Sequence, residues 1–364
     1  MKKLVHNNAK TVITIIVTFL GICIIGSVLH YGKEQPSNTA DFINQHMRNA
    51  NGTLATYLQD AQTTDPNIVA GREALSESQG LWMHYAVMQH DQQTFDESLQ
   101  LLTTYFLTPQ KYIQWKLRPT GHSEVSTNAL GDDLRIIDSL LKAYAVWNDE
   151  KYLNLAKEIS STLQTEGKQN GYFVDFHDFK RNESSQTLSL VYVDLSALKK
   201  MKANHLITSN EYDQYENLLL HMPNDGVFYP KSFDVYSKQY TYDESVNLID
   251  QLIVGIHMAE AGQQPTPLIQ FLKSEFEKRH QLMGRYNRQT REPDVSYESP
   301  GVYGLAILLA LKGDDVQWAK QLEDQMLKLR DQDSAYKGGY VFDNNTHIFD
   351  NLFPLLAETT LNND

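Results

Sequence analysis

The stretch LSESQGLWM, residues 75–83, opens a segment that is apolar on nearly every face. A glutamate, Glu77, lies beside hydroxyl residues at its start, and similar acidic positions open five further segments of this kind: Asp132, Asp194, Asp243, Glu298 and Asp350. Each segment except the last is followed by one with a single apolar stripe. A helix that is hydrophobic all round is buried, whereas a striped helix covers a core from outside. The sequence therefore predicts paired inner and outer helices.

The inner helices are expected over 76–90, 132–147, 194–203, 243–261, 298–311 and 350–359, and the outer ones over 94–107, 150–163, 211–222, 267–283 and 316–329. A first helix, from about residue 40 to 61, supplies the missing outer partner and closes a ring. Two short extended pieces, 171–176 and 338–342, are expected within loops. The predicted fold is all-α, an (α/α)6 barrel over residues 40–364, with six acidic helix starts around one mouth. A solenoid of helical hairpins is the competing architecture, but its repeats run roughly 33 to 47 residues, against roughly 55 here.

Residues 11–30 form an apolar run without any charged side chain, about as long as a bilayer is thick. A cleaved signal peptide would have a shorter apolar region and a small-residue cleavage site. The tetrapeptide at 20–23 superficially resembles a lipoprotein box, but Ile22 is bulky where a small residue is needed.

The charges around this run predict its orientation in the membrane. Three lysines precede it, and positive charge tends to stay in the cytoplasm: Lys2, Lys3 and Lys10. The sequence thus predicts a cytoplasmic N-terminus over 1–10, one transmembrane anchor over 11–30, a tether over 31–39 and a domain outside the cell membrane.

Composition excludes several classes of function. A net charge of −13 argues against nucleic acid and disfavours anionic polymers, while neutral or cationic glycans remain admissible. Cys23 is the single cysteine, so the outer domain has no disulfide and no thiolate metal site. No histidine pair has the helical spacing of a zinc site, and no phosphate loop or dinucleotide fingerprint occurs. Neither a metal nor an organic cofactor is expected.

Spacing alone gives Glu77 a structural interpretation. Ser76 with Gln79 fits a capping box, and a glutamate in the first turn favours the helix dipole. A general acid must keep its proton, so a catalytic Glu77 would need burial or a neighbouring carboxylate. Glu298, before Ser299 and a proline, is expected to be structural.

The motif Ser76-Glu77-Ser78-Gln79, with Met83 in phase, resembles the general-acid motif Ser-Glu-x-Gln of glycoside hydrolase family 8. Two further motifs are similar to that family: 129–152, through Asp133-Leu134, Trp147 and Tyr152, and the pair Tyr242-Asp243. More narrowly, the chain resembles membrane-anchored glycosidases of this family encoded beside bacterial exopolysaccharide synthases.

The resemblance implies an inverting mechanism with Glu77 as general acid and Asp243 as general base. Because these residues open the first and fourth inner helices, a closed ring would place them on opposite walls of the mouth. Inverting glycosidases need such a separation, so that a water fits between base and sugar. Glu244 and Asp250 are rival bases.

Two positions depart from the family pattern. Gly131 stands where the family has the aspartate that contacts the sugar at the cleavage site, and Asp132 is the nearest substitute. Val246, followed by Asn247, replaces the arginine of the third motif.

The expected sugar contacts are acidic and aromatic residues near the mouth: Asp132, Asp133, Trp82, Trp115 and Tyr242. Trp115 lies on a long loop, where a tryptophan needs a functional reason. Trp82 suits the core equally well, and Trp147 and Trp318 are in phase for packing.

The sequence thus predicts a membrane-anchored, extracytoplasmic, endo-acting glycosidase that cleaves a bacterial exopolysaccharide or a β-linked, glucan-like polymer. Its expected partners are the polysaccharide, the cell membrane through the N-terminal helix, and the exopolysaccharide synthesis machinery. A non-catalytic glycan-binding or synthase-associated protein on the same barrel is the alternative. A helical scaffold for protein partners is a third possibility, although it would not need an acid-lined mouth with a tryptophan.

Overall fold

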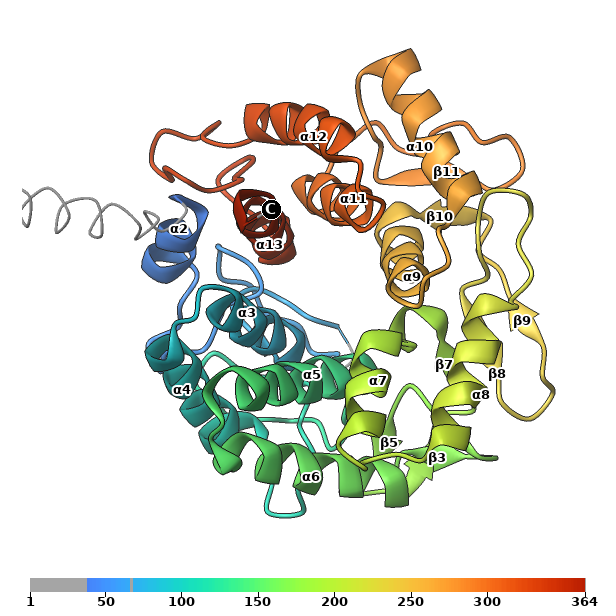
Figure 1. Ribbon diagram of the computed structural model, residues 1–364. Coiled ribbons are helices and arrows are strands. Elements are labelled where there is room, and N and C mark those ends of the chain that lie inside the picture. Colours follow the sequence, from blue (N-terminus) through green and yellow to red (C-terminus); the bar gives the residue numbers. More distant parts are fainter. Residues whose placement is uncertain (1–37, 66–67, 364) are drawn as a thin grey trace, which may run out of the picture. The chain divides into compact units, whose positions relative to one another are not determined.

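The computed structural model describes residues 38–65 and 68–363. Six inner helices contact one another in sequence order, and the last contacts the first, so that they close a ring (Figure 1). These inner helices are α3 (Ser76–Met88), α5 (Leu130–Trp147), α7 (Leu195–Ala203), α9 (Leu248–Glu260), α11 (Pro300–Lys312) and α13 (Phe349–Asn363). The ring confirms the predicted closed helical barrel, and the N-terminal ends of α3 and α9 belong to opposite members of it.

The outer helices lie around this ring in Figure 1. They are α4 (Gln92–Leu101), α6 (Glu150–Thr165), α8 (Ser209–Leu220), α10 (Thr266–Arg279) and α12 (Val316–Lys328). The short α2 (Asn38–His46) packs on α13 and completes the set, as predicted. Four outer helices begin at a capping side chain: Asp91, Asp149, Thr208 and Asp315. Such a cap satisfies backbone N–H groups that the first helical turn leaves free.

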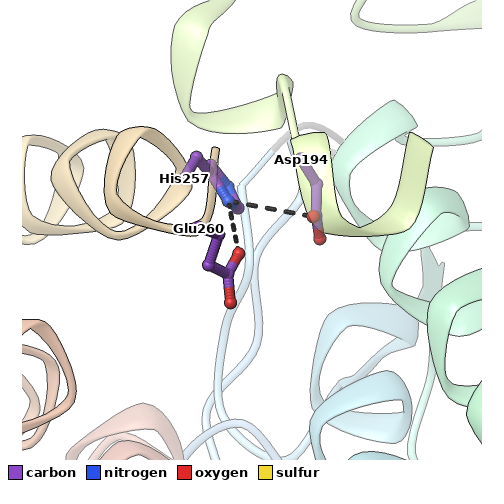
Figure 2. A group of neighbouring side chains, drawn as sticks. All are labelled: Asp194, His257 and Glu260. Atoms are coloured by element: carbon purple, nitrogen blue, oxygen red, sulfur yellow. Dashed lines mark ion pairs between the residues drawn. The ribbon is translucent and has the colours of Figure 1, made fainter. Parts of the chain in front are cut away.

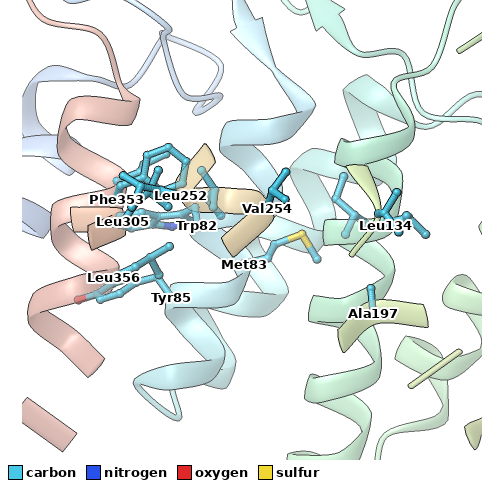
Figure 3. Close-up of a cluster of buried hydrophobic side chains, with 14 of the residues drawn as sticks. Trp82, Met83, Tyr85, Leu134, Ala197, Leu252, Val254, Leu305, Phe353 and Leu356 are labelled. Carbon is cyan, nitrogen blue, oxygen red and sulfur yellow. The ribbon is translucent and has the colours of Figure 1, made fainter. Parts of the chain in front are cut away.

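Apolar side chains from all six inner helices meet in one buried cluster (Figure 3). α6 shows the complementary pattern, because its buried residues follow one helical face. The division into inner and outer helices therefore comes from the width of each apolar surface.

Several predicted boundaries need correction. The first helix ends at His46, because the following Asn49–Gly52 turn, in which Gly52 has a φ of +88°, interrupts it. The outer segment after α4 continues as a π-helix, η1 (Leu102–Phe106). Asp243 does not open a helix, since α9 starts five residues later.

The strands are pieces of two or three residues that fasten loops together. They pair as β1 (Ala74–Leu75) with β2 (Lys116–Leu117), β3 (Lys168–Gln169) with β4 (Tyr172–Phe173), β5 (His177–Asp178) with β6 (Glu183–Ser184), β7 (Thr187–Ser189) with β8 (Ser232–Asp234), β8 with β9 (Tyr240–Thr241), and β10 (Ser245–Asn247) with β11 (Arg285–Asn287). All pairs are antiparallel. β1 and β10 run directly into α3 and α9, so these strands fix the starts of two opposite inner helices. The extended piece predicted over 338–342 forms no strand.

In the part of the chain that the structure describes, no helix is both long and apolar enough to cross a membrane. The anchor predicted over 11–30 lies outside the described residues.

Candidate active site

Glu77 is the second residue of α3, at the mouth of the ring. The preceding residue, Ser76, holds this helix start against the neighbouring loop, because its backbone N–H donates to the Trp115 carbonyl at 3.0 Å. The predicted capping box does not form. The Ser76 hydroxyl donates instead to Asp132 at 2.5 Å, and the Gln79 amide donates to the Ser98 carbonyl at 2.8 Å. Both side chains therefore connect α3 to other elements and do not cap it.

Glu77 lies between a cation and a second carboxyl group. Arg135, from α5, pairs with Glu77 at 3.1 Å. Asp132, in the first turn of α5, is only 5% exposed. Burial first, and then the charge of Glu77, raise the pKa of Asp132 to about 7, although the Ser76 hydroxyl and Arg135 act in the opposite direction. Glu77 and Asp132 thus form a pair of neighbouring carboxyl groups at the starts of α3 and α5.

Asp133 belongs to a buried network behind the mouth. Its side chain is 1% exposed, and one carboxylate oxygen accepts from the Asn128 amide at 2.6 Å. The amide oxygen of Asn128 in turn accepts from the backbone N–H of His177 at 2.7 Å. Burial raises the pKa of Asp133 well above its usual value. Of the two adjacent aspartates, Asp133 is held in this buried network, whereas Asp132 is hydrogen-bonded to Ser76 at the start of α3.

Tyr192 occupies the space that a side chain at position 131 would take. It ends the short 3-10 helix η2 (Leu190–Tyr192), and a Cβ built on Gly131 would lie 2.3 Å from its ring. Burial, followed by the charges of Asp132 and Glu77, raises the pKa of Tyr192. Where the resemblance implies an aspartate, this chain therefore has Gly131, with the Tyr192 ring beside the same two carboxyl groups.

Asp250 and Asp243 lie together on the opposite wall. Both line one small cavity with Lys231 and Arg288. Asp243 pairs with Lys231 at 3.1 Å and is half-buried. Asp250 lies in the first turn of α9, where the Asn247 amide donates to it at 3.3 Å.

The surroundings of Asp250 favour its protonated form. Burial first, and then the charges of Asp243 and Glu77, raise the pKa of Asp250 to about 6, against the opposing charges of Lys231 and Arg285. Asp250 lies at the start of α9, opposite Glu77 at the start of α3 in the ring.

The three aromatic candidates differ in exposure. Trp82 is 2% exposed and belongs to the central apolar cluster, so its assignment as a sugar-stacking platform was wrong (Figure 3). The reason is that α3 is surrounded by packed helices along its whole apolar surface. Trp115 is half-buried beside the start of α3, with the Lys116 ammonium 5.4 Å from its ring. Tyr242 is 46% exposed, and Arg288 lies 5.2 Å from its ring.

The remaining acidic positions hold structural hydrogen bonds. Glu298 accepts from the side chains of Gln281 and Gln325 at 2.9 and 3.0 Å, as its structural interpretation predicts. Asp350 accepts from Ser299 and from the backbone N–H of Gly301, and so caps α11.

Arg135 and Tyr192 are site residues that the sequence interpretation did not identify. Tyr192 precedes Asp194, one of the acidic helix starts, by two residues, and this is the signal that could have found it. Arg135 carries no motif of its own, and only the ring geometry brings it to Glu77.

Comparisons with known proteins identify the family and the fold. Residues 46–170 match the family described as Glycosyl hydrolases family 8. A Bacillus subtilis (strain 168) protein described as putative lipoprotein YdaJ is 37% identical over 326 residues, which span 89% of this chain and 86% of that protein.

Two solved structures share the fold over most of their length. One is described as a novel alpha-amylase from Clostridium perfringens, with a TM-score of 0.80 and 26% identity over 88% of this chain and 96% of that one. PssZ from Listeria monocytogenes has a TM-score of 0.73 and 25% identity over 90% and 96% of the two chains.

Proposed function

We propose that this chain, which belongs to glycosyl hydrolase family 8, cleaves a polysaccharide within its chain by inversion, with Glu77 as general acid. That it is a glycosidase follows from the family. The proposed inversion, with Glu77 as general acid, is supported by the arrangement of four carboxyl groups. Glu77 and Asp132 lie on one wall of the mouth, and Asp250 with Asp243 on the other. A polymer lying across the mouth would have carboxyl groups on both sides of one glycosidic bond.

Glu77 is placed to protonate the leaving oxygen, with Asp132 beside it to bind the sugar. On the opposite wall, the base would remove a proton from water as that water attacks the anomeric carbon. Asp250 fits this role better than Asp243, because a base is most effective with a pKa near the working pH. Asp243 already has Lys231 as its partner, and its charge contributes to the raised pKa of Asp250.

The substrate proposed from the chain's own features is a neutral or cationic exopolysaccharide or a β-linked, glucan-like polymer. The net charge of −13 repels polyanions. A second substrate class, an α-linked glucan, is favoured by the likeness to the structure described as an alpha-amylase. The linkage therefore has to be measured directly.

Incubation of the full-length protein with a panel of α- and β-linked polysaccharides tests the proposal. Wild type should release oligosaccharides from one of them, and Glu77→Gln should lower the rate by about 10² to 10⁴, since it keeps the shape but removes the proton. Glu298→Gln is the matched control, because that carboxyl lies among structural hydrogen bonds. Equal activity in Glu77→Gln and wild type would exclude Glu77 as the acid.

For localisation, we propose that residues 11–30 anchor the domain to the outer side of the cell membrane. The support is the uncharged run with lysines before it and the description of the Bacillus relative as a putative lipoprotein. Protease added to intact cells should remove the domain, whereas a fully protected protein would contradict this topology. A Cys23→Ser variant that leaves the membrane fraction would show that a lipid, and not the helix, is the anchor.

A further inference from the structure

A second group of polar residues lies deeper in the ring than the acidic mouth. A cavity of about 420 Å³ is lined by side chains of all six inner helices. Its wall includes Asp194, the N-cap of α7, and His257 and Glu260 in the last turns of α9 (Figure 2). His257 follows Asp250 by seven residues, which is roughly 10 Å along the helix axis. This group is therefore separate from the carboxyl groups at the mouth.

The hydrogen bond of His257 defines which ring nitrogen is free. Its Nε2 lies 3.3 Å from the Val191 carbonyl oxygen. A carbonyl oxygen can only accept, so Nε2 carries the proton in this bond. In the neutral ring, Nδ1 then has an unshared electron pair. Metal-binding histidines commonly have their second nitrogen fixed in the same way by a backbone carbonyl.

Nδ1 of His257 points between two carboxylates, within ion-pair distance of both but too far from either for a hydrogen bond (Figure 2). It lies 3.8 Å from Asp194 Oδ1 and 3.7 Å from Glu260 Oε2, and has no hydrogen-bond partner among the described residues. His257 is 8% exposed, so water does not readily satisfy this atom. A buried polar atom without a partner is costly and needs an explanation.

The distances from Nδ1 to the two carboxylates are too long for a direct hydrogen bond and leave room for an ion between the three groups. Ligand atoms that each lie about 2.1 Å from a metal are separated by roughly 3 to 3.5 Å from one another. The three atoms here all lie within 4.8 Å of one another. His257 and Glu260 are three residues apart and so lie on one face of α9. A small side-chain adjustment would bring all three atoms into one coordination sphere.

Nearby cations bind oxygens other than the two that face Nδ1. Lys312 pairs with Oε1 of Glu260 at 3.1 Å. Asp138, on the same cavity wall, pairs with Lys142 and Lys200. The backbone N–H of Ala197 donates to Asp194 Oδ1 at 2.8 Å and holds it in place, which leaves that oxygen another lone pair.

We propose that Asp194, His257 and Glu260 bind one divalent transition-metal ion of the zinc class. An imidazole nitrogen with two carboxylates suits zinc, manganese or cobalt, whereas magnesium and calcium prefer oxygen ligands alone. The remaining coordination position would open into the cavity. The ion would join the start of α7 to the end of α9, and it is independent of hydrolysis at the mouth.

A proton on Nδ1 is the competing occupant. Burial lowers the pKa of His257, but Asp194 and Glu260 together outweigh it and hold that pKa above its usual value. A protonated His257 would form an ion pair with both carboxylates and would bind no metal. The experiment must therefore distinguish metal from proton.

Calorimetric titration of the metal-stripped, full-length protein with zinc chloride at pH 8 makes this distinction. We expect one ion per chain, a higher melting temperature with zinc, and a visible absorption band when cobalt replaces zinc. Glu260→Gln should weaken binding at least tenfold and abolish the zinc-dependent rise in melting temperature. Because this variant keeps the side chain's shape and its contact to Lys312, it should still fold, which circular dichroism would verify.

His84→Asn provides the matched control. His84 lines the same cavity, and its Nδ1 lies 3.3 Å from the Lys142 ammonium, so it is not a member of the proposed site. This variant should bind zinc as wild type does. Absence of saturable binding in wild type, or equal binding in wild type and Glu260→Gln, would overturn the proposal. Since no readout depends on substrate, its failure would leave the glycosidase assignment untouched.

Discussion

Three carboxyl groups at the mouth have different surroundings, and those surroundings suggest different roles. Glu77 pairs with Arg135, Asp132 is buried against Ser76, and Asp250 lies in a small cavity close to Asp243. The raised pKa values of Asp132, about 7, and Asp250, about 6, have burial as their largest cause. Carboxyl groups with perturbed pKa values are typical of a catalytic site.

The choice between the two candidate bases can be tested through the pH profile. A base must be ionised, so activity should fall as the pH drops through about 6, the pKa of Asp250. Asp250→Asn should abolish this acid limb and lower kcat by about 10² to 10⁴. Asp243→Asn removes a neighbouring negative charge, so it should shift the limb to lower pH and retain more activity. The reverse ranking of the two variants would identify Asp243 as the base.

For single residues, the sequence was informative where a motif indicated the chemistry, as at Glu77. It was weak where tertiary packing determines what a side chain contacts. Nothing in the local sequence could show that Trp82 is enclosed by neighbouring helices or that Ser76 bonds across to Asp132. Gly131 was identified as a departure, but its cause, the Tyr192 ring, comes from a segment 61 residues further along the chain. Such contacts depend on tertiary packing and have no periodic signature.

The inner helices α11 and α13 pack backbone to backbone at Gly304. A Cβ at Gly304 would lie 2.5 Å from the backbone carbonyl carbon of Phe353 and 2.7 Å from the nitrogen of Pro354. Backbone atoms cannot rotate away as a side chain can. The close packing of α11 on α13 therefore requires a residue without a side chain at this position.

Gly304→Ala should lower the free energy of unfolding by about 1 to 3 kcal/mol, the usual cost of overpacking a core. Chemical denaturation followed by circular dichroism measures this change. Gly255→Ala is the matched control in another inner helix, because its nearest neighbour is the flexible end of Leu268 at 3.2 Å. There, the better helix propensity of alanine should offset much of the cost. Equal stability of the Gly304 variant and wild type would mean that α11 and α13 can separate freely.

Helix periodicity predicted the existence and inner or outer class of these elements, since the width of an apolar surface is local information. It did not predict ends that turns decide, such as the stop at His46, or the start of α9 at Leu248. The second difference leaves Asp243 on the loop before α9 and Asp250 in its first turn.

For the whole molecule, closure of the ring determines which carboxyl groups can cooperate. α3 and α9 are opposite members of six, so groups at their starts face each other across the mouth (Figure 1). A solenoid of the same hairpins would leave Glu77 and Asp250 far apart along an open array. Sequence repetition could suggest closure, but the contact of α13 with α3 demonstrates it.

Opposed carboxyl groups also predict the stereochemistry of cleavage. Direct attack on the sugar requires a carboxylate about 5 Å from the acid, whereas a wider separation admits water and favours inversion. Full-length protein acting on a polymer of known linkage should therefore release the opposite anomer, α from a β-linked chain and β from an α-linked one. Proton NMR in the first minutes, before mutarotation, identifies the anomer, and mass spectrometry should show no covalent sugar adduct. A product of unchanged configuration would require a nucleophile close to Glu77, and the assignment of base catalysis to the α9 wall would have to be abandoned.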